Sequence, residues 1–158
     1  MPGVLFVCTA NVCRSPMASA LFLARLKAER EDWEQWLVDS AGTWAHEGQP
    51  ASANSVKAMA SRDLDISRHR SKEVSEAFLE MFDLVLTMET SHKEALRVEF
   101  PRLAGRIFLL SEMSGPAKNV EDPFGLTLKD YEKTAQEIEE YMVAGFAEIM
   151  KRVALAGK

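Results

Sequence analysis

A short apolar run, a cysteine and a helix start follow one another near the beginning of this chain, and no other stretch limits the fold as much. Residues 4–7 are all apolar, which is typical of a strand covered on both faces. Cys8 follows directly, and five residues separate it from Arg14. Ser15 and Pro16 then open a helical pattern. The sequence therefore predicts a buried strand that brings a thiol and a guanidinium to a helix N-terminus, a position where proteins bind anions.

The residue types of this loop suit a phosphate that is attacked by sulfur. A helix N-terminus favours the thiolate form of Cys8, and Arg14 offers a planar fork for two phosphate oxygens. Asn11 tolerates a left-handed backbone, which helps consecutive N–H groups to point inward as an anion nest. The predicted phosphate-binding residues are Thr9, Ala10, Asn11, Val12, Cys13 and Arg14.

Two residues of the loop admit more than one role. Ser15 can cap the helix with Pro16 at its first position, or it can donate a hydrogen bond to the Cys8 thiolate, or do both. A cysteine after a strand is most often a small buried apolar residue, and a Cys-x5-Arg spacing alone is weak evidence. The preceding strand, the Ser-Pro helix start and the internal asparagine make the anion-binding interpretation the stronger one.

The composition of the chain indicates a soluble globular protein and argues against nucleic-acid and membrane partners. The 158 residues are 47% apolar and 27% charged, as expected for one soluble globular domain covering residues 1–158. The net charge of −5 argues against nonspecific nucleic-acid binding, which needs a basic face. No apolar run approaches the roughly 20 residues needed to cross a bilayer, and the first residues lack a signal-peptide pattern. We therefore expect neither a nucleic-acid partner nor a membrane partner.

The two cysteines point to reduced thiols. A structural disulfide between Cys8 and Cys13 would close a very small loop, and the pair lacks nearby ligands for a zinc site. The simplest expectation is a cytoplasmic protein that needs no metal and no other cofactor.

Apolar runs alternate with helical patterns along the chain. The predicted strands are 4–7, 36–39, 84–87 and 107–110, and the predicted helices are 17–30, 53–62, 72–80, 91–99 and 127–154. This alternation predicts an α/β fold with a four-stranded parallel sheet, order 2-1-3-4, and helices on both faces. Ligands of such sheets bind beyond the carboxyl ends of the strands, where the cysteine loop lies. Residues 111–125 show no periodicity, and loops of that length in a compact domain are usually functional or disordered.

These motifs together resemble the low-molecular-weight protein tyrosine phosphatases. The family signature is Cys-x5-Arg-Ser near the N-terminus and Asp-Pro in a late loop, which correspond here to residues 8–15 and to Asp122 with Pro123. The resemblance covers the whole chain, including residues 39–43, the segment around His69 and the long final helix. It implies a flavodoxin-like phosphotyrosine phosphatase I fold. Phe124 after the Asp-Pro pair, where many members carry tyrosine, is similar to the bacterial branch.

The resemblance also implies catalytic roles. Cys8 would attack phosphorus and form a phosphocysteine, while Arg14 and the loop amides would stabilise the transition state. Asp122 would protonate the leaving oxygen and later activate water. Pro123 would hold Asp122 in an extended backbone conformation. The implied substrate is a phosphotyrosine-containing protein, and the implied state is a monomer without a metal.

Other residues receive supporting roles from the resemblance. Asn11 and Ser15 would brace the loop, with His69 bonded to Asn11, although a lone histidine is more often a surface residue. Val12, Trp44 and Phe124 would form the pocket wall around a substrate ring, although Trp44 can equally lie on the surface.

Cys13 and Ala10 raise separate questions. The resemblance implies a reversible disulfide from Cys13 to Cys8 that shields the nucleophile, while the alternative for Cys13 is a packed residue at the helix start. The family usually has glycine where this chain has Ala10, and a positive φ there would strain the loop.

Three other functions deserve comparison. Thioredoxin-coupled arsenate reductases need further cysteines in mid-chain, which this sequence lacks. Protein arginine phosphatases resemble this chain but carry threonine at the position of Val12, whose apolar side chain suits an aryl phosphate better. A non-catalytic phosphate-binding module would not need both Cys8 and Asp122. We therefore expect a phosphotyrosine phosphatase, with phosphoarginine as the alternative substrate.

Overall fold

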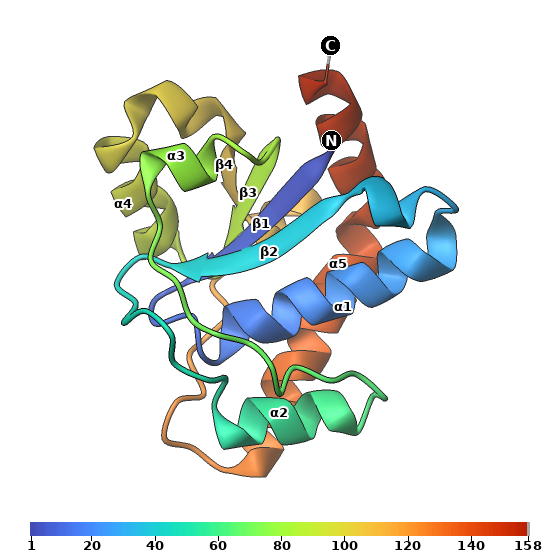
Figure 1. The fold of residues 1–158 in the computed structure, drawn as a ribbon, viewed down its shortest axis with the longest axis vertical. Helices are drawn as coiled ribbons and strands as arrows, with labels where there is room; N and C mark the ends of the chain where they lie inside the picture. Colours follow the sequence, from blue (N-terminus) through green and yellow to red (C-terminus); the bar gives the residue numbers. More distant parts are fainter. Residues whose placement is uncertain (158) are drawn as a thin grey trace.

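A parallel four-stranded sheet forms the centre of the computed structural model, which describes residues 1–157 (Figure 1). The strands are β1 (Gly3–Cys8), β2 (Leu37–Gly42), β3 (Leu84–Thr87) and β4 (Ile107–Leu109). Their order is β2-β1-β3-β4, so the predicted order is confirmed. The first strand occupies an interior position with β2 and β3 on either side, and the chain leaves it at the edge where ligands of such sheets bind.

Helices cover both faces of the sheet, as predicted. One face carries α1 (Arg14–Glu29) and α5 (Leu128–Ala156), with α2 (Ala53–Ala60) against them; the other carries α3 (Glu76–Leu79) and α4 (Thr90–Glu99) (Figure 1). Short 3-10 segments that were not predicted are η1 (Trp33–Gln35), η2 (Pro101–Arg106) and η3 (Leu110–Met113). Within residues 1–157, every helix is too short or too polar to cross a bilayer.

Strand β1 divides the core into two halves. Val4 and Phe6 face the α1 and α5 side, whereas Leu5 and Val7 face the α3 and α4 side, and all four are completely buried. Each such side chain stabilises the fold by about 1.5–3 kcal/mol. The uninterrupted apolar run seen in the sequence therefore reflects a strand with protein on both faces.

The second strand is longer than predicted. Its last residues, which lie beyond the predicted strand at 36–39, pair with the end of β1 as far as the register Cys8 to Gly42. Gly42 allows this close approach, because a Cβ at that position would lie 2.3 Å from the carbonyl oxygen of Thr9. Small residues at 40–42 concealed the strand: Ser40 bonds to Asn11 and Gly42 packs against the Cys8 loop, while only Ala41 belongs to the apolar core.

The predicted helix at 72–80 is mostly wrong. Only α3 is helical, and the residues before it run beside β2, where Gly42 donates to the carbonyl of Lys72 and accepts from the amide of Val74. The Ser75 side chain then caps α3. Tertiary hydrogen bonds override the helical pattern here, whereas the other predicted elements agree with the structure to within three residues at each end.

The start of α1 also differs from the prediction. The helix begins at Arg14 with Cys13 as its N-cap, so Ser15 is not the capping residue and Pro16 is not the first helical residue. The hydroxyl of Ser15 is instead engaged inside the cysteine loop. This difference leaves Arg14 and Ser15 on the first turn of the helix, and both are buried.

Candidate active site

The loop between β1 and α1, residues 8–14, encloses a cavity of about 140 Å³ at the carboxyl edge of the sheet. We call these residues the Cys8 loop. The cavity is lined by Cys8, Thr9, Ala10, Val12, Cys13, Arg14, Asp122 and Phe124. The structure thus brings the predicted nucleophile, arginine and acid to one small cavity, although Asp122 comes from a loop far along the chain.

Ser15 lies against the predicted nucleophile. Its Oγ is 2.9 Å from Sγ of Cys8 and accepts a hydrogen bond of 2.8 Å from Nδ2 of Asn11. Since the amide nitrogen of Asn11 can only donate, the hydroxyl hydrogen of Ser15 remains for an acceptor, either the sulfur at 2.9 Å or the carbonyl of Ala41 at 3.4 Å, and the sulfur is the nearer of the two. Of the two roles considered for Ser15, the structure contains the contact to the thiol.

Asn11 braces the Cys8 loop from within. Its φ of 60° is left-handed, as its residue type suggested. Its side chain donates to Ser40 Oγ at 2.9 Å as well as to Ser15, and accepts from the backbone N–H of Lys72 at 3.0 Å. Nε2 of His69 donates to the Asn11 carbonyl at 2.6 Å, which is the predicted histidine contact. Burial lowers the pKa of His69, so the neutral ring makes this bond near pH 7.

Ala10 does not carry the strain that a positive φ would bring. The non-glycine residues with positive φ in the described chain are Asn11 and Asp63. The left-handed residue of the Cys8 loop is therefore Asn11, so an alanine at position 10 brings no steric cost of this kind.

Arg14 is held rigidly by one of its terminal nitrogens. The side chain is 1% exposed, and Nη1 donates to Glu89 at 2.8 Å and to the carbonyl of Val120 at 2.7 Å. Nη2 lies 3.5 Å from Oγ1 of Thr9 and 3.7 Å from Oδ2 of Asp122, and Nε has no partner within residues 1–157. Nε and Nη2 form one edge of the guanidinium fork, so the edge suited to two phosphate oxygens is the one that the protein leaves available.

Glu89 and His92 were missed by the sequence analysis. Glu89 follows β3 at the same sheet edge as the Cys8 loop, and His92 lies one turn later on α4, 4% exposed. His92 Nε2 is 2.8 Å from Oγ1 of Thr9. Burial and the nearby Arg14 guanidinium lower the pKa of His92 to about 4. The sequence did contain a signal for Glu89, because polar residues that directly follow a strand of a parallel sheet lie at the edge where ligands bind.

Asp122 stands on the cavity wall within reach of water. Its side chain is 45% exposed, and Oδ1 accepts a hydrogen bond of 3.0 Å from the backbone N–H of Phe124. That bond leaves Oδ2 on the side of Arg14, at 3.7 Å from Nη2. The loop thus fixes one carboxylate oxygen and presents the other to the cavity.

The two aromatic residues predicted for the pocket wall behave differently. Phe124 lines the cavity, although it is 68% exposed. Trp44 is 76% exposed and is not among the residues that line the cavity, so its role at a bound substrate ring stays a prediction. Its backbone N–H donates to the carbonyl of Thr9, which places the main chain at the loop while the ring extends into solvent.

Cys13 is packed at the start of α1. Its Sγ lies 3.5 Å from Oγ of Ser52 and 3.4 Å from the hydroxyl of Tyr131, and both cysteines are free thiols. Burial raises the pKa of Cys13. The packed alternative is therefore present, and the disulfide to Cys8 stays a prediction.

Comparison with known proteins identifies the architecture. A family model described as low molecular weight phosphotyrosine protein phosphatase matches residues 3–155. The chain belongs to this family. Its membership makes it a hydrolase of the protein phosphatase class. In the part of the chain that the structure describes, no group of histidine, cysteine, aspartate and glutamate side chains could hold a metal ion.

Relatives of this phosphatase carry two different names. A protein-arginine-phosphatase of Bacillus subtilis is 38% identical over 140 residues, 88% of this chain and 91% of its own. A probable low molecular weight protein-tyrosine-phosphatase, EpsP, of Ralstonia nicotianae is 33% identical over 86% of this chain and 88% of its own. The crystal structure of a low molecular weight protein tyrosine phosphatase from T. tengcongensis superimposes with a TM-score of 0.85 at 41% identity, covering 96% of this chain and 99% of its own.

Proposed function

We propose that this phosphatase hydrolyses phosphotyrosine monoesters on proteins through a phosphocysteine on Cys8, with Asp122 as general acid and base. The observation that carries the proposal is a single cavity of about 140 Å³ that holds both residues and Arg14. A nucleophile, a cation for the phosphoryl oxygens and a proton donor are the parts that such a transfer needs.

The first step transfers the phosphoryl group to sulfur. The Cys8 thiolate, supported by the Ser15 hydroxyl at 2.9 Å, attacks phosphorus and forms an S–P bond. The P–O bond to the tyrosine breaks on the opposite side, and Asp122 gives its proton to the leaving phenolate oxygen. The Nε and Nη2 edge of Arg14 and the loop amides hold the remaining phosphoryl oxygens.

The second step returns the enzyme to its starting state. Asp122 is now a carboxylate and removes a proton from a water molecule, whose oxygen attacks phosphorus. The S–P bond breaks, the Cys8 thiolate is restored and inorganic phosphate leaves. The 45% exposure of the Asp122 side chain gives water access to this position.

The cavity wall supports an aryl substrate. Val12 and Phe124 both line the cavity, and Val12 is half-buried there, so the entrance presents apolar surface. A phenyl ring would remove that surface from water, at about 25 cal/mol per Å² of buried apolar area. A guanidinium would find no hydrogen-bond acceptor on Val12.

Phosphoarginine is the second candidate substrate. It is favoured by the 38% identity to the protein-arginine-phosphatase of Bacillus subtilis. The difference at Val12, where arginine phosphatases carry threonine, weighs against it. The two candidates share the same cavity, nucleophile and acid, so only a rate comparison can separate them.

The test is a comparison of kcat/KM on peptides that carry phosphotyrosine, phosphoserine or phosphoarginine at the same position. We expect phosphotyrosine to be fastest and phosphoserine to be negligible, because a serine side chain is too short to bring its phosphate to Cys8. Faster hydrolysis of phosphoarginine would replace the proposed substrate by the second candidate. Failure on all three peptides would reject the phosphatase proposal.

We further propose that the chain acts as one catalytic domain, as a monomer, in a reducing compartment such as the cytoplasm. The free thiols of Cys8 and Cys13 support the reducing compartment. A sedimentation experiment at micromolar concentration tests the monomer, and a dimer would contradict it.

A further inference from the structure

Thr9 and His92 meet directly behind the reaction site. Thr9 follows the nucleophile and lines the cavity, whereas His92 comes from the first turn of α4 and is 4% exposed. Oγ1 of Thr9 and Nε2 of His92 are 2.8 Å apart. No step of the proposed reaction described above uses this contact.

The hydrogen bonds of the His92 ring decide which nitrogen carries the proton. The backbone N–H of Glu89 donates to Nδ1 at 3.1 Å, so Nδ1 is the acceptor and a neutral ring carries its hydrogen on Nε2. The ring is neutral near pH 7 because burial and Arg14 lower the pKa of His92 to about 4. Oε2 of Glu89 is 3.6 Å from Nε2, beyond hydrogen-bond distance, which leaves Oγ1 of Thr9 as the acceptor.

The Thr9 hydroxyl therefore receives hydrogen bonds on its oxygen. Besides the bond from His92, Nη2 of Arg14 donates to the same oxygen at 3.5 Å. A hydroxyl has two acceptor positions and one hydrogen. Because N–H donors face both acceptor positions of the Thr9 oxygen, the hydroxyl hydrogen points into the cavity.

We propose that His92 is a positioning residue, which fixes the Thr9 hydroxyl as a hydrogen-bond donor to an oxygen of the transferred phosphoryl group. The inference rests on the proposed phosphatase function. Phosphoryl oxygens only accept hydrogen bonds, so a hydroxyl that turned a lone pair toward them would repel them. A donor that is oriented before the substrate binds needs no reorganisation during the reaction.

A pair of substitutions separates the two bonds of His92. The Asn side chain in His92→Asn can still accept from the Glu89 amide at the start of α4, but it is too short to reach Thr9. The longer side chain in His92→Gln can place its N–H group where Nε2 of the histidine lies. Thr9→Val removes the hydroxyl at nearly constant shape, and His46→Asn is the matched control at an exposed histidine.

The measurements are kcat and KM for p-nitrophenyl phosphate, inhibition by orthovanadate as a transition-state analogue, and Tm. We expect His92→Asn and Thr9→Val each to lower kcat and vanadate affinity by about tenfold or more, the usual effect of losing a hydrogen bond to a charged group. KM should change less. His92→Gln should recover most of the loss, and the Thr9→Val/His92→Asn double variant should be no worse than Thr9→Val alone.

Several results would overturn the inference. Vanadate affinity in Thr9→Val equal to that of the wild type would do so, whatever happens at position 92. So would equal impairment of His92→Gln and His92→Asn with lowered Tm, since that pattern marks a purely structural histidine. If the wild type is active and His92→Asn matches His46→Asn, the inference alone fails. If the wild type hydrolyses no phosphate ester or phosphoarginine, the proposed function fails first.

Discussion

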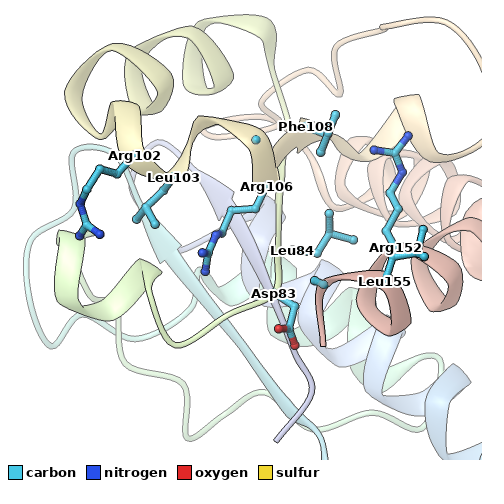
Figure 2. Close-up of a pocket in the computed structure, with 10 residues that line it drawn as sticks. Asp83, Leu84, Arg102, Leu103, Arg106, Phe108, Arg152 and Leu155 are labelled. Atoms are coloured by element: carbon cyan, nitrogen blue, oxygen red, sulfur yellow. The ribbon is translucent and has the colours of Figure 1, made fainter. Parts of the chain in front are cut away.

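The two edges of the sheet carry cavities of opposite character. The carboxyl edge holds the small cavity of about 140 Å³ above the Cys8 loop. The amino edge holds a larger one of about 490 Å³, between η2, the start of β3 and the end of α5 (Figure 2). Size alone would place the active site at the amino edge, where Arg102, Arg106 and Arg152 are found.

The arginines at the two edges differ in their burial and in how their guanidinium N–H groups are paired. Arg102 has a side chain 66% exposed and pairs with Glu76 and Glu80 on the surface. Arg152 pairs with Glu148 and lies 4.3 Å above the ring of Phe108.

Arg14 at the carboxyl edge is almost completely buried and is held through Nη1, while its Nε has no partner in residues 1–157. Because a buried donor without a partner is costly, a ligand that supplies one binds strongly. Nε of Arg25 and Nε1 of Trp36 are buried without a partner as well, but neither belongs to a guanidinium that is 1% exposed and fixed through an ion pair with Glu89. The comparison teaches that a buried, fixed arginine with a free donor edge marks this active site better than volume does.

The largest expected effect tests the nucleophile at the carboxyl edge. Cys8→Ser should lower kcat on phosphotyrosine by about 10⁴-fold or more, because a serine hydroxyl is far less ionised than a thiol near pH 7. Stopped-flow assays with the wild type beside the variant check this, and Cys13→Ser is the matched control for loss of a thiol. Turnover in Cys8→Ser at the wild-type rate would end the phosphocysteine mechanism.

The next effect concerns the proton donor. Asp122→Ala should slow turnover by about 10²- to 10⁴-fold, the usual range for a general acid. The loss should be larger on phosphotyrosine, whose leaving phenol has a pKa of about 10, than on p-nitrophenyl phosphate, whose leaving group is more acidic. Equal losses on the two substrates would assign the proton transfer to another residue.

Much of this carboxyl edge could be predicted from the sequence. The strand at 4–7, the loop and the helix after it appear as local patterns, so their arrangement could be inferred before the structure. The β2-β1-β3-β4 order agrees with the prediction. Cys8, Arg14 and Asp122 line one cavity at this edge, and their catalytic roles stay predictions.

What could not be predicted depends on long-range contacts. Lys72 looks helical by local pattern, but its amide is bound by Asn11, 61 residues away in sequence. The sheet order places His92 at the ligand edge, but its contact with Thr9 depends on how α4 packs, which no local pattern contains. The exposed position of the Trp44 ring could not be predicted for a related reason, since a loop sequence does not determine which way a ring turns.

His92 also gives the carboxyl edge a sensitivity to acid. The pKa of His92 falls from 6.5 to about 4 on folding, so between these values the unfolded chain binds a proton that the folded chain does not. This difference in pKa contributes up to about 3 kcal/mol to the free energy of unfolding. The contribution is fully present above pH 6.5 and is lost as the pH falls toward 4. Burial and Arg14 lower this pKa, while Glu89 and Asp122 act in the opposite direction.

Urea unfolding at pH 7.0, 5.5 and 4.5 measures this sensitivity. The free energy of unfolding of the His92→Gln variant should fall less with acid than that of the wild type. A weaker dependence of the free energy of unfolding on pH should remain in the variant, because burial lowers the pKa of His69 too. Equal slopes in the variant and the wild type would remove His92 as the cause.

A smaller effect tests the cavity wall. Val12→Thr should raise the ratio of phosphoarginine to phosphotyrosine kcat/KM by up to about tenfold, because the added hydroxyl can accept from a guanidinium. Val12→Ala is the control, since it shortens the side chain without adding a polar atom. A ratio that stays constant in Val12→Thr, or that rises equally in Val12→Ala, would show that this position does not select the substrate.

The smallest expected effect lies at the amino edge, and it tests the comparison of the two cavities most directly. Arg102→Gln should leave kcat/KM within about twofold of the wild type and lower the free energy of unfolding by less than about 1 kcal/mol, the usual value of exposed ion pairs. Its guanidinium pairs with the exposed carboxylates of Glu76 on α3 and Glu80 beside it, so its removal leaves no buried charge unpaired. A parallel measurement of phosphate inhibition shows whether the larger cavity affects the smaller one. A tenfold change in either quantity would mean that exposed, paired arginines at the amino edge act on the reaction, and that the burial and fixation of Arg14 are not what distinguishes the two edges.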